Sequence, residues 1–313
     1  MSRAREALSE IPLSTFCFGN ICVATYCFQI FANPRTHDFT MNPYRVLFMH
    51  EYYRIISSAF FHGNLMHIGM NMLSFMALGK SLEKCFGTLW ITITILWSIV
   101  LTSSIEMLIA FAAYMIGSED LMNQHSLGFS AVLFHLLTLE SYRSPDSLQS
   151  IFGMMRVSSK FYPWAILVVT QILLPQASFL GHLSGIVCGI LQSCGQLNII
   201  MPSASFLRQC DDSRRLQFIS CRESYVRTAF DDAFFVFSNS SSARSGIASV
   251  ANIVCKFIRD LLETIKYMVF GRDGGGNQNI QFTEETVALN DSEWVGIPKV
   301  PSPKQIPSEA EMV

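Results

Sequence analysis

Gly181-His182-Leu183-Ser184-Gly185-Ile186-Val187-Cys188-Gly189 places a histidine in an apolar stretch in which glycine recurs at every fourth residue. Glycines at this spacing lie on one face of a helix and allow a neighbouring helix to approach closely. A histidine inside hydrocarbon is costly and is usually functional. The stretch therefore predicts a membrane helix that carries a functional side chain beside a close helix–helix contact.

A second stretch, Gly128-Phe129-Ser130-Ala131, stands at the start of another apolar segment. A serine held at a helix start can act as a nucleophile, and a histidine can activate it as a general base. If this helix packs against the glycine face, Ser130 and His182 come within hydrogen-bond distance. The pair therefore indicates a serine hydrolase built within a bilayer.

The composition indicates a membrane domain followed by a polar tail. Hydrophobic residues make up 50% of the 313 residues and charged residues 15%, against roughly 25% charged residues in soluble domains. Charges are sparse before Ile200, and no basic excess points to a nucleic-acid partner. We predict an all-α membrane domain over 1–200 with six transmembrane helices, and a cytosolic, partly disordered tail over 201–313. The predicted helices are Leu13–Ala32, Met66–Leu82, Leu89–Ile116, Leu127–Ser141, Phe161–Leu174 and Ser178–Leu197.

The charges of the connecting loops predict the orientation of these helices. Lysine and arginine gather in the second and fourth connections and after the sixth helix, which places both termini in the cytosol. The first connection, 33–63, also contains arginines but must be translocated in this scheme. Ser130 and His182 then lie at similar depth near the non-cytosolic surface. Asn20 and Gln29 interrupt the first apolar stretch and favour a retained helix over a cleavable signal peptide.

Two polar residues of the second predicted helix could stabilise the oxyanion of an acyl-transfer reaction. His67 and Asn71 lie one turn apart on the same helix face. An imidazole and an amide in this arrangement suit an oxyanion site better than a metal site. Backbone N–H groups near Ser130 would add further donors. No metal or other cofactor is expected for this chemistry.

Less specific explanations exist for each of these residues. A single serine in a membrane helix usually bonds its own backbone, and a single histidine can bond a neighbouring helix. His62 and His67 could bind zinc, but the sequence has no His-Glu-x-x-His motif. His135 lies one turn beyond Ser130 and deeper in the membrane, so we interpret it as a helix–helix hydrogen-bonding residue rather than as the base.

Together, these motifs resemble those of the rhomboid intramembrane serine proteases. Five separated motifs occur in the order expected of that family, over residues 10–200. The tail is most similar to that of the six-helix rhomboids of the endoplasmic reticulum. The motifs are Tyr53-Arg54, His67-x-x-x-Asn71, Gly79-x-x-x-Glu83-x-x-x-Gly87, Gly128-Phe129-Ser130-Ala131 and Gly181-His182-Leu183-Ser184-Gly185.

The resemblance implies a role for each residue of the predicted site. Ser130 would be the nucleophile and His182 the base. His67 and Asn71 would face the oxyanion, and Gly128 would let the loop pass close to the substrate backbone. The expected partners are the lipid bilayer and single-span membrane proteins, which would enter past a mobile fifth helix. The expected location is the secretory pathway, in the endoplasmic reticulum or Golgi.

The chain departs from the family pattern at three positions. Ala131 stands where glycine is commoner, Tyr53 where tryptophan is usual, and Phe134 where a tyrosine often packs under the histidine. Phe134 can still stack on His182, and no required proton donor or acceptor is lost. An alternative function is that of a catalytically weak or inactive scaffold that binds membrane clients in trafficking or quality control.

The tail contains one predicted helix and one weak motif. Apolar residues at three–four spacing predict an amphipathic helix near 247–269. This helix could lie on the cytosolic leaflet, cover the membrane domain or bind a partner. The sequence of 284–292 faintly resembles a ubiquitin-interacting helix, so weak contact with ubiquitin or an adaptor is an alternative to an acidic disordered tail.

Overall fold

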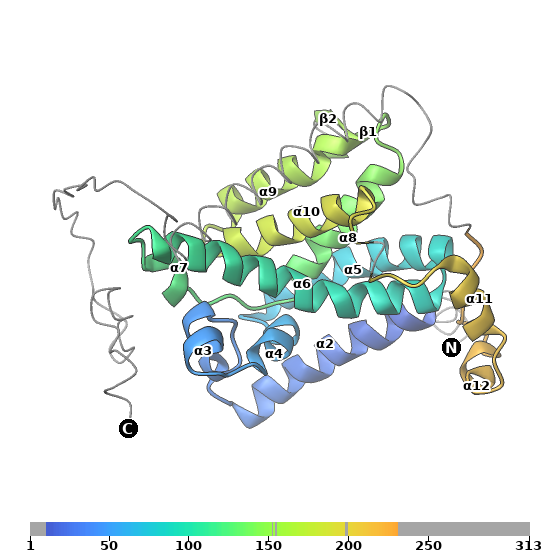
Figure 1. Cartoon of the computed structure of the whole chain (residues 1–313), viewed down its shortest axis with the longest axis horizontal. Coiled ribbons are helices and arrows are strands. Elements are labelled where there is room, and N and C mark those ends of the chain that lie inside the picture. Colours follow the sequence, from blue (N-terminus) through green and yellow to red (C-terminus); the bar gives the residue numbers. More distant parts are fainter. Residues whose placement is uncertain (1–10, 152, 154, 198–199, 231–313) are drawn as a thin grey trace, which may run out of the picture.

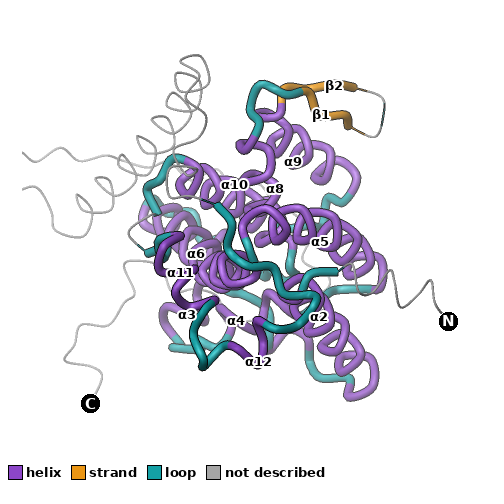
Figure 2. The backbone as a smooth tube through the Cα atoms, turned by 90° about the vertical axis from the view of Figure 1, so that its right-hand side faces the viewer, coloured by secondary structure: helices purple, strands orange, loops and turns teal. Residues whose placement is uncertain are grey.

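The computed structural model describes residues 11–151, 153, 155–197 and 200–230. These residues form a bundle of long helices with shorter helices at its ends and one small β-hairpin at its periphery (Figure 1, Figure 2). The predicted amphipathic helix near 247–269 and the motif at 284–292 lie outside the described residues.

Helices lie at each of the six positions where the sequence predicts them. They are α2 (Leu13–Ala32), α5 (Leu65–Phe86), α6 (Thr88–Met115), α8 (Ser130–Arg143), α9 (Tyr162–Leu173) and α10 (Phe179–Ser193). By length and composition, α2 and α6 are the two described helices that could cross a membrane. The last three have 14, 12 and 15 residues, fewer than the roughly 20 that an isolated span needs. Most residues of α8 and α10 are buried by other helices, whereas α9 lies at the edge of the bundle and buries only Pro163 and Leu167.

Short elements connect these helices. They are η1 (Thr36–Asp38), α3 (Pro43–Phe48), α4 (Arg54–Phe60), α7 (Asp120–Asn123), β1 (Leu148–Ile151), β2 (Met155–Ser158), η2 (Ser159–Phe161), α11 (Ala204–Asp211) and α12 (Gln217–Ser220). Strands β1 and β2 pair antiparallel, with Leu148 opposite Ser158. Figure 1 shows α3 and α7 at one end of the bundle and α11 with α12 at the other.

Helix α6 is the central helix of the bundle. It contacts α2, α5, α8 and α10, and Figure 1 shows it between α2 on one side and α8 with α10 on the other. Its buried face includes Trp90, Ile91 and Ile95, which belong to one core cluster together with Phe75 and Phe129. Burying these large side chains holds the end of the loop before α8 against the core.

Helices α8 and α10 approach each other most closely at two glycines. A Cβ added at Gly185 would lie 2.3 Å from the carbonyl oxygen of Ala131. A Cβ at Gly189 would lie 2.5 Å from the Cβ of Thr138. Neither position therefore has room for a side chain. The prediction that the glycine face of α10 packs against the helix of Ser130 is confirmed.

Glu83 is fully buried on α5 and joins the starts of two other helices. Its Oε1 accepts hydrogen bonds from the N–H of Ser14 at 2.8 Å and the hydroxyl of Thr88 at 2.7 Å. Its Oε2 accepts from the N–H and the hydroxyl of Thr15, both at 2.7 Å. Helix α2 follows Pro12 and has no side-chain cap of its own. The Glu83 carboxylate therefore supplies the acceptors that its first turn lacks.

Replacing Glu83 with glutamine is expected to lower the free energy of unfolding by about 3 kcal/mol. The reason is that an amide NH₂ would face two donors at the position where the carboxylate oxygen accepts both. The thermal unfolding midpoint of Glu83→Gln, purified in detergent, measures the effect. The control is Lys84→Gln, which changes the exposed neighbouring residue. Equal midpoints for the two variants would show that the Glu83 network contributes little.

The first connection is organised around the buried guanidinium of Arg54. Arg54 is 1% exposed, and its Nη1 donates to the carbonyl oxygens of His37 and Thr40, both at 2.9 Å. Its Nε donates to the carboxylate of Glu51. These bonds order the loop that precedes α4. A backbone bridge between Met41 and Ser126 then joins this loop to the segment that leads into α8.

The chain after α10 packs back onto the bundle. The N–H of Leu13 donates to the carbonyl oxygen of Ser224, and the N–H of Thr88 to that of Val226, both at 2.8 Å. The N–H of Val226 in turn donates to the hydroxyl of Thr88 at 2.9 Å. The first part of the predicted tail, residues 204–230, therefore packs against the membrane domain at the starts of α2 and α6.

Candidate active site

Ser130 and His182 are brought together by the close packing of α8 and α10. Ser130 is the first residue of α8, and His182 lies in the first turn of α10. The distance between Ser130 Oγ and His182 Nε2 is 2.9 Å, although the residues are 52 positions apart in sequence. The hydrogen-bond contact expected from the sequence is therefore present, and it lies beside the contact of Gly185 with Ala131.

Aromatic packing holds the imidazole of His182 in place. The ring of Phe134 stacks on it, with centroids 4.4 Å apart and an interplanar angle of 26°. The stacking predicted for Phe134 is thus confirmed. His182 is 3% exposed, and its Nδ1 has no hydrogen-bond partner among the described residues. The ring is therefore oriented by packing and by its contact with Ser130, not by a carboxylate.

His67 and Asn71 converge on the loop that precedes the serine. A Cβ added at Gly128 would lie 2.6 Å from Cε1 of His67 and 3.4 Å from Nδ2 of Asn71. Gly128 also has φ +110°, which strains any other residue. The Asn71 amide nitrogen is buried and has no hydrogen-bond partner in the described part of the chain. A free amide donor therefore faces the backbone two residues before Ser130.

His62 has a contact at the site that sequence reasoning did not assign. Its ring packs edge-on against His67, with centroids 5.2 Å apart. Its Nε2 accepts a long hydrogen bond, 3.5 Å, from the N–H of Phe129. His62 thus supports the loop before Ser130. The only sequence signal for it was its position five residues before His67.

His135 contacts α10 at a point away from the serine. Its Nε2 lies 2.8 Å from Oε1 of Gln192, and both side chains are buried. The interpretation of His135 as a helix–helix hydrogen-bonding residue is therefore confirmed.

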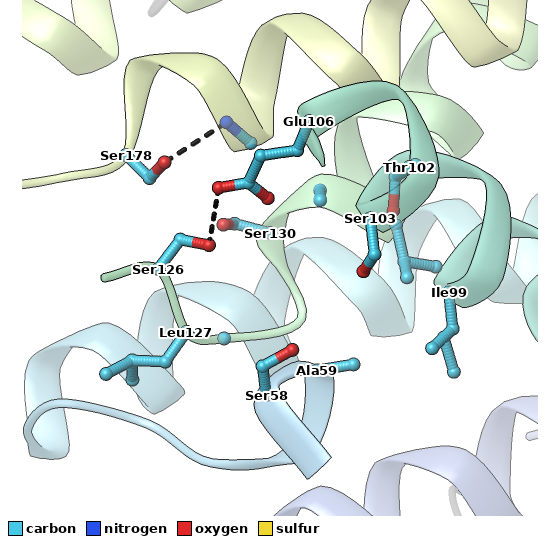
Figure 3. Close-up of a pocket in the computed structure, with 14 residues that line it drawn as sticks. Ser58, Ala59, Ile99, Thr102, Ser103, Glu106, Ser126, Leu127, Ser130 and Ser178 are labelled. Carbon is cyan, nitrogen blue, oxygen red and sulfur yellow. Dashed lines mark hydrogen bonds between the residues drawn. The ribbon is translucent and has the colours of Figure 1, made fainter. Parts of the chain in front are cut away.

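A small pocket adjoins Ser130 between α4, α6 and the start of α8 (Figure 3). Its lining is rich in hydroxyl groups and includes one charged residue, Glu106 of α6. Glu106 is 6% exposed, and its Oε1 accepts a hydrogen bond from the hydroxyl of Ser126 at 2.7 Å. Glu106 belongs to none of the sequence motifs. The available signal was an acidic residue inside the apolar stretch 89–116.

A pair of histidines outside the long helices links the first connection to the loop before Ser130. The rings of His37 and His125 lie 3.7 Å apart between centroids. Thr40 donates its hydroxyl proton to the carbonyl of His37, so His125 Nδ1, 2.7 Å from that hydroxyl, must donate to it. His125 Nε2 then accepts from the amide of Asn42 at 3.1 Å. This network requires a neutral His125 ring.

Burial, followed by the charges of His37, Arg54 and Arg45, lowers the pKa of His125 to about 4. Burial and Arg45 also lower the pKa of His37. A histidine in the unfolded chain takes up its proton near pH 6.5. The unfolded state therefore binds more protons than the folded state between about pH 6.5 and pH 4. The stability that the neutral pair contributes is complete above this window and is lost as the pH falls through it.

Acidification from pH 7.5 to pH 5 is expected to lower the free energy of unfolding, with about 2 kcal/mol of the loss caused by His125. The measurement is the thermal unfolding midpoint at each pH for wild type and His125→Gln. The variant should show a smaller decrease than wild type, because its amide does not titrate. Parallel curves for the two proteins would show that another group causes the pH dependence.

Residues 49–197 match the family model described as Rhomboid domain. The chain is 29% identical to Rhomboid-like protein 15 of Arabidopsis thaliana over 72% of this chain and 60% of that protein. It is 32% identical to Rhomboid-related protein 4 of Homo sapiens over 50% of this chain and 49% of that protein. It is 26% identical to Rhomboid-type serine protease 2 of Neurospora crassa over 78% of this chain and 89% of that protein. The chain therefore spans less than two thirds of the first two relatives. On these matches and this geometry, the chain belongs to the rhomboid family of integral membrane proteins.

Proposed function

We propose that the chain is an intramembrane serine endopeptidase that cleaves single-span membrane proteins. The observation that carries the proposal is the 2.9 Å distance between Ser130 Oγ and His182 Nε2. This hydrogen-bond contact pairs a nucleophile with a base on two different helices. The two helices pack so closely that Gly185 has no room for a side chain. The fungal relative that carries the words serine protease in its name adds support.

In the proposed reaction, Ser130 Oγ attacks the carbonyl carbon of the scissile peptide bond. His182 Nε2 takes the hydroxyl proton and then gives it to the leaving amine, which completes the acyl-enzyme. A water molecule, deprotonated by the same nitrogen, then attacks the ester. This second step releases the carboxylic acid and returns the proton to Ser130. The dyad needs no third member, because Phe134 already fixes the plane of the imidazole.

The negative charge of the tetrahedral intermediate would be stabilised beside Gly128. The Asn71 amide has unused donor capacity at this position, and His67 lies next to it. The N–H of Ser130, at the start of α8, would add a backbone donor. Donors arranged before the reaction act on charge as it develops, and one such donor is worth about 10²–10³ in rate.

The proposed topology has both termini in the cytosol and the site near the opposite surface. In support, the segment after α10 bonds to the starts of α2 and α6, whereas the Met41–Ser126 bridge lies by the start of α8.

Helix α9 buries only Pro163 and Leu167 among its own residues. A helix held so weakly suits a gate for a substrate helix. The proposed location is the secretory pathway, and this part of the proposal rests on the resemblance of the sequence motifs and the tail to rhomboids of the endoplasmic reticulum.

The test is cleavage of a panel of single-span membrane reporters co-expressed with wild type, Ser130→Ala or His182→Ala. Cleavage by wild type that is lost in both variants is the expected result. The matched control is Ser104→Ala, because Ser104 is half-buried on α6 and its hydroxyl donates to the carbonyl oxygen of Val100 in its own helix. Cleavage that survives Ser130→Ala would overturn the proposed nucleophile. Capture of reporters without cleavage by any form would favour the binding scaffold.

A further inference from the structure

The segment after α10 carries several arginines that face away from the bundle. Residues 204–230 contain five arginines and three acidic residues. Asp211 is buried, and Asp212 pairs with Arg227 at 2.6 Å, which leaves Glu223 against the remaining arginines. Three exposed arginines form no ion pair within the part of the chain that the structure describes: Arg214, Arg215 and Arg222.

These arginines surround an exposed phenylalanine on a short helical run. Backbone hydrogen bonds between residues three or four apart run through 213–222 and include α12. Arg214 and Arg215 precede Phe218 by four and three positions, and Arg222 follows it by four, so the four side chains gather on one side of the run. Phe218 is 68% exposed, whereas Ser220 is buried on the other side. Arg214, Arg215, Phe218 and Arg222 together are called the basic surface below.

Buried contacts hold the basic surface in a fixed position. The carboxylate of Asp211 accepts hydrogen bonds from the hydroxyl of Tyr225 and from the N–H of Thr228, the latter at 2.8 Å. It thereby joins the chain before the helical run to the chain after it. The ring of Phe230 packs against that of Phe86 on α5, with centroids 5.5 Å apart. A surface ordered in this way loses little conformational entropy when a ligand binds.

The same segment is fixed to the ends of two long apolar helices. The carbonyl oxygens of Ser224 and Val226 accept hydrogen bonds from the N–H groups of Leu13 and Thr88. Leu13 and Thr88 begin α2 and α6, the two described helices that are long and apolar enough to cross a membrane. Figure 1 shows α11 and α12 beside the end of the bundle at which α2 begins. The basic surface therefore lies at the level of the lipid headgroups.

We propose that the basic surface binds the anionic headgroups of phospholipids in the membrane that the protein spans. Arginine forms charge-assisted, often bidentate hydrogen bonds with phosphate and carboxylate groups. Phe218 enters the layer between the headgroups and the acyl chains, as the apolar residues of interfacial helices do. The anionic lipids of a cell membrane are concentrated in its cytosolic leaflet, which agrees with the proposed topology. The inference does not depend on the proposed protease activity.

The experiment measures lipid binding to the full chain, purified in an uncharged detergent, by native mass spectrometry. The quantity is the lipid preference, which is the apparent Kd for phosphatidylcholine divided by that for phosphatidylserine with the same acyl chains. The test variant is Arg214→Gln/Arg215→Gln/Arg222→Gln, and a second variant has lysine at the same three positions. The control variant removes the same charge elsewhere in the chain, as Arg35→Gln/Arg156→Gln/Lys160→Gln.

Wild type and the control variant are expected to show a lipid preference of about 100-fold, since each arginine near the headgroups adds about 5-fold. The glutamine variant should lower this preference at least 10-fold, and the lysine variant should retain most of it. Phe218→Ala should weaken the binding of both lipids about 10-fold and leave their ratio unchanged. Equal preferences in wild type and the glutamine variant would overturn the proposal. An equal loss in the control variant would do the same, because it would indicate an effect of the total charge.

Two further outcomes would identify a different occupant of the basic surface. Glycerophosphoserine has the headgroup of phosphatidylserine and no acyl chains, and it is expected not to compete with the lipid at equal concentration. Competition at equal concentration would overturn the lipid assignment in favour of a soluble anion. A lipid preference near 1 in wild type would also overturn it and would favour an acidic protein segment as the partner.

Discussion

Alanine in place of Ser130 or His182 is expected to lower the cleavage rate by about 10⁴-fold or more, and alanine at both positions should lower it no further. In the proposed mechanism the two side chains share one proton transfer, and the structure places their reacting atoms 2.9 Å apart. Once the serine is absent, the histidine has no hydroxyl to activate. Once the histidine is absent, the hydroxyl remains a weak nucleophile. Any residual rate would come from substrate binding and from donors such as Asn71.

The measurement is the single-turnover rate of a reporter with each single variant and with the double variant, in liposomes. Ser104→Ala again serves as the control, with a rate expected to equal that of wild type. If the losses of the two single variants multiplied in the double variant, the two residues would be acting in separate steps. That result would contradict a dyad even if each variant were inactive in a simple cleavage assay.

The dyad and the long helices could be predicted because their signals are local. Apolar stretches predict helices at all six positions. Polar residues inside such stretches are energetically costly in hydrocarbon, so their presence indicates a function. The spacing of Gly181, Gly185 and Gly189 also marked the face of α10 that packs against α8. The contact between Ser130 and His182 followed from these two signals together. Family resemblance then supplied roles that spacing alone does not.

The pocket and the contacts after α10 could not be predicted in the same way. The sequence shows Glu106 as an acidic residue in an apolar stretch. Its position beside Ser130, however, depends on how α4, α6 and the loop before α8 pack against one another. The bonds of Leu13 with Ser224 and of Thr88 with Val226 join backbone groups, which every residue carries. The hairpin of β1 and β2 has strands of four residues each, too short for a clear alternating pattern.

Gly185→Ala is expected to lower the free energy of unfolding by about 3 kcal/mol or more and to reduce cleavage by about 100-fold. The added methyl would lie 2.3 Å from the carbonyl oxygen of Ala131. That oxygen belongs to the backbone of α8, so the two helices must separate to relieve the clash. Ala131 directly follows Ser130, and Gly185 lies three residues after His182. Separation at this point is therefore expected to displace Ser130, the proposed nucleophile, from His182, its proposed base.

The control for this prediction is Gly69→Ala on α5, where an added Cβ would meet nothing within 4 Å. Alanine has the higher helix propensity, so Gly69→Ala should be neutral or stabilising by up to about 1 kcal/mol. Thermal unfolding and cleavage would be measured on both variants, with cleavage assayed at a temperature where each is folded. A folded Gly185→Ala protein with normal cleavage would show that the helix contact does not set the geometry of the dyad. A cleavage loss that persists in folded Gly185→Ala would link the glycine face of α10 directly to the chemistry at Ser130.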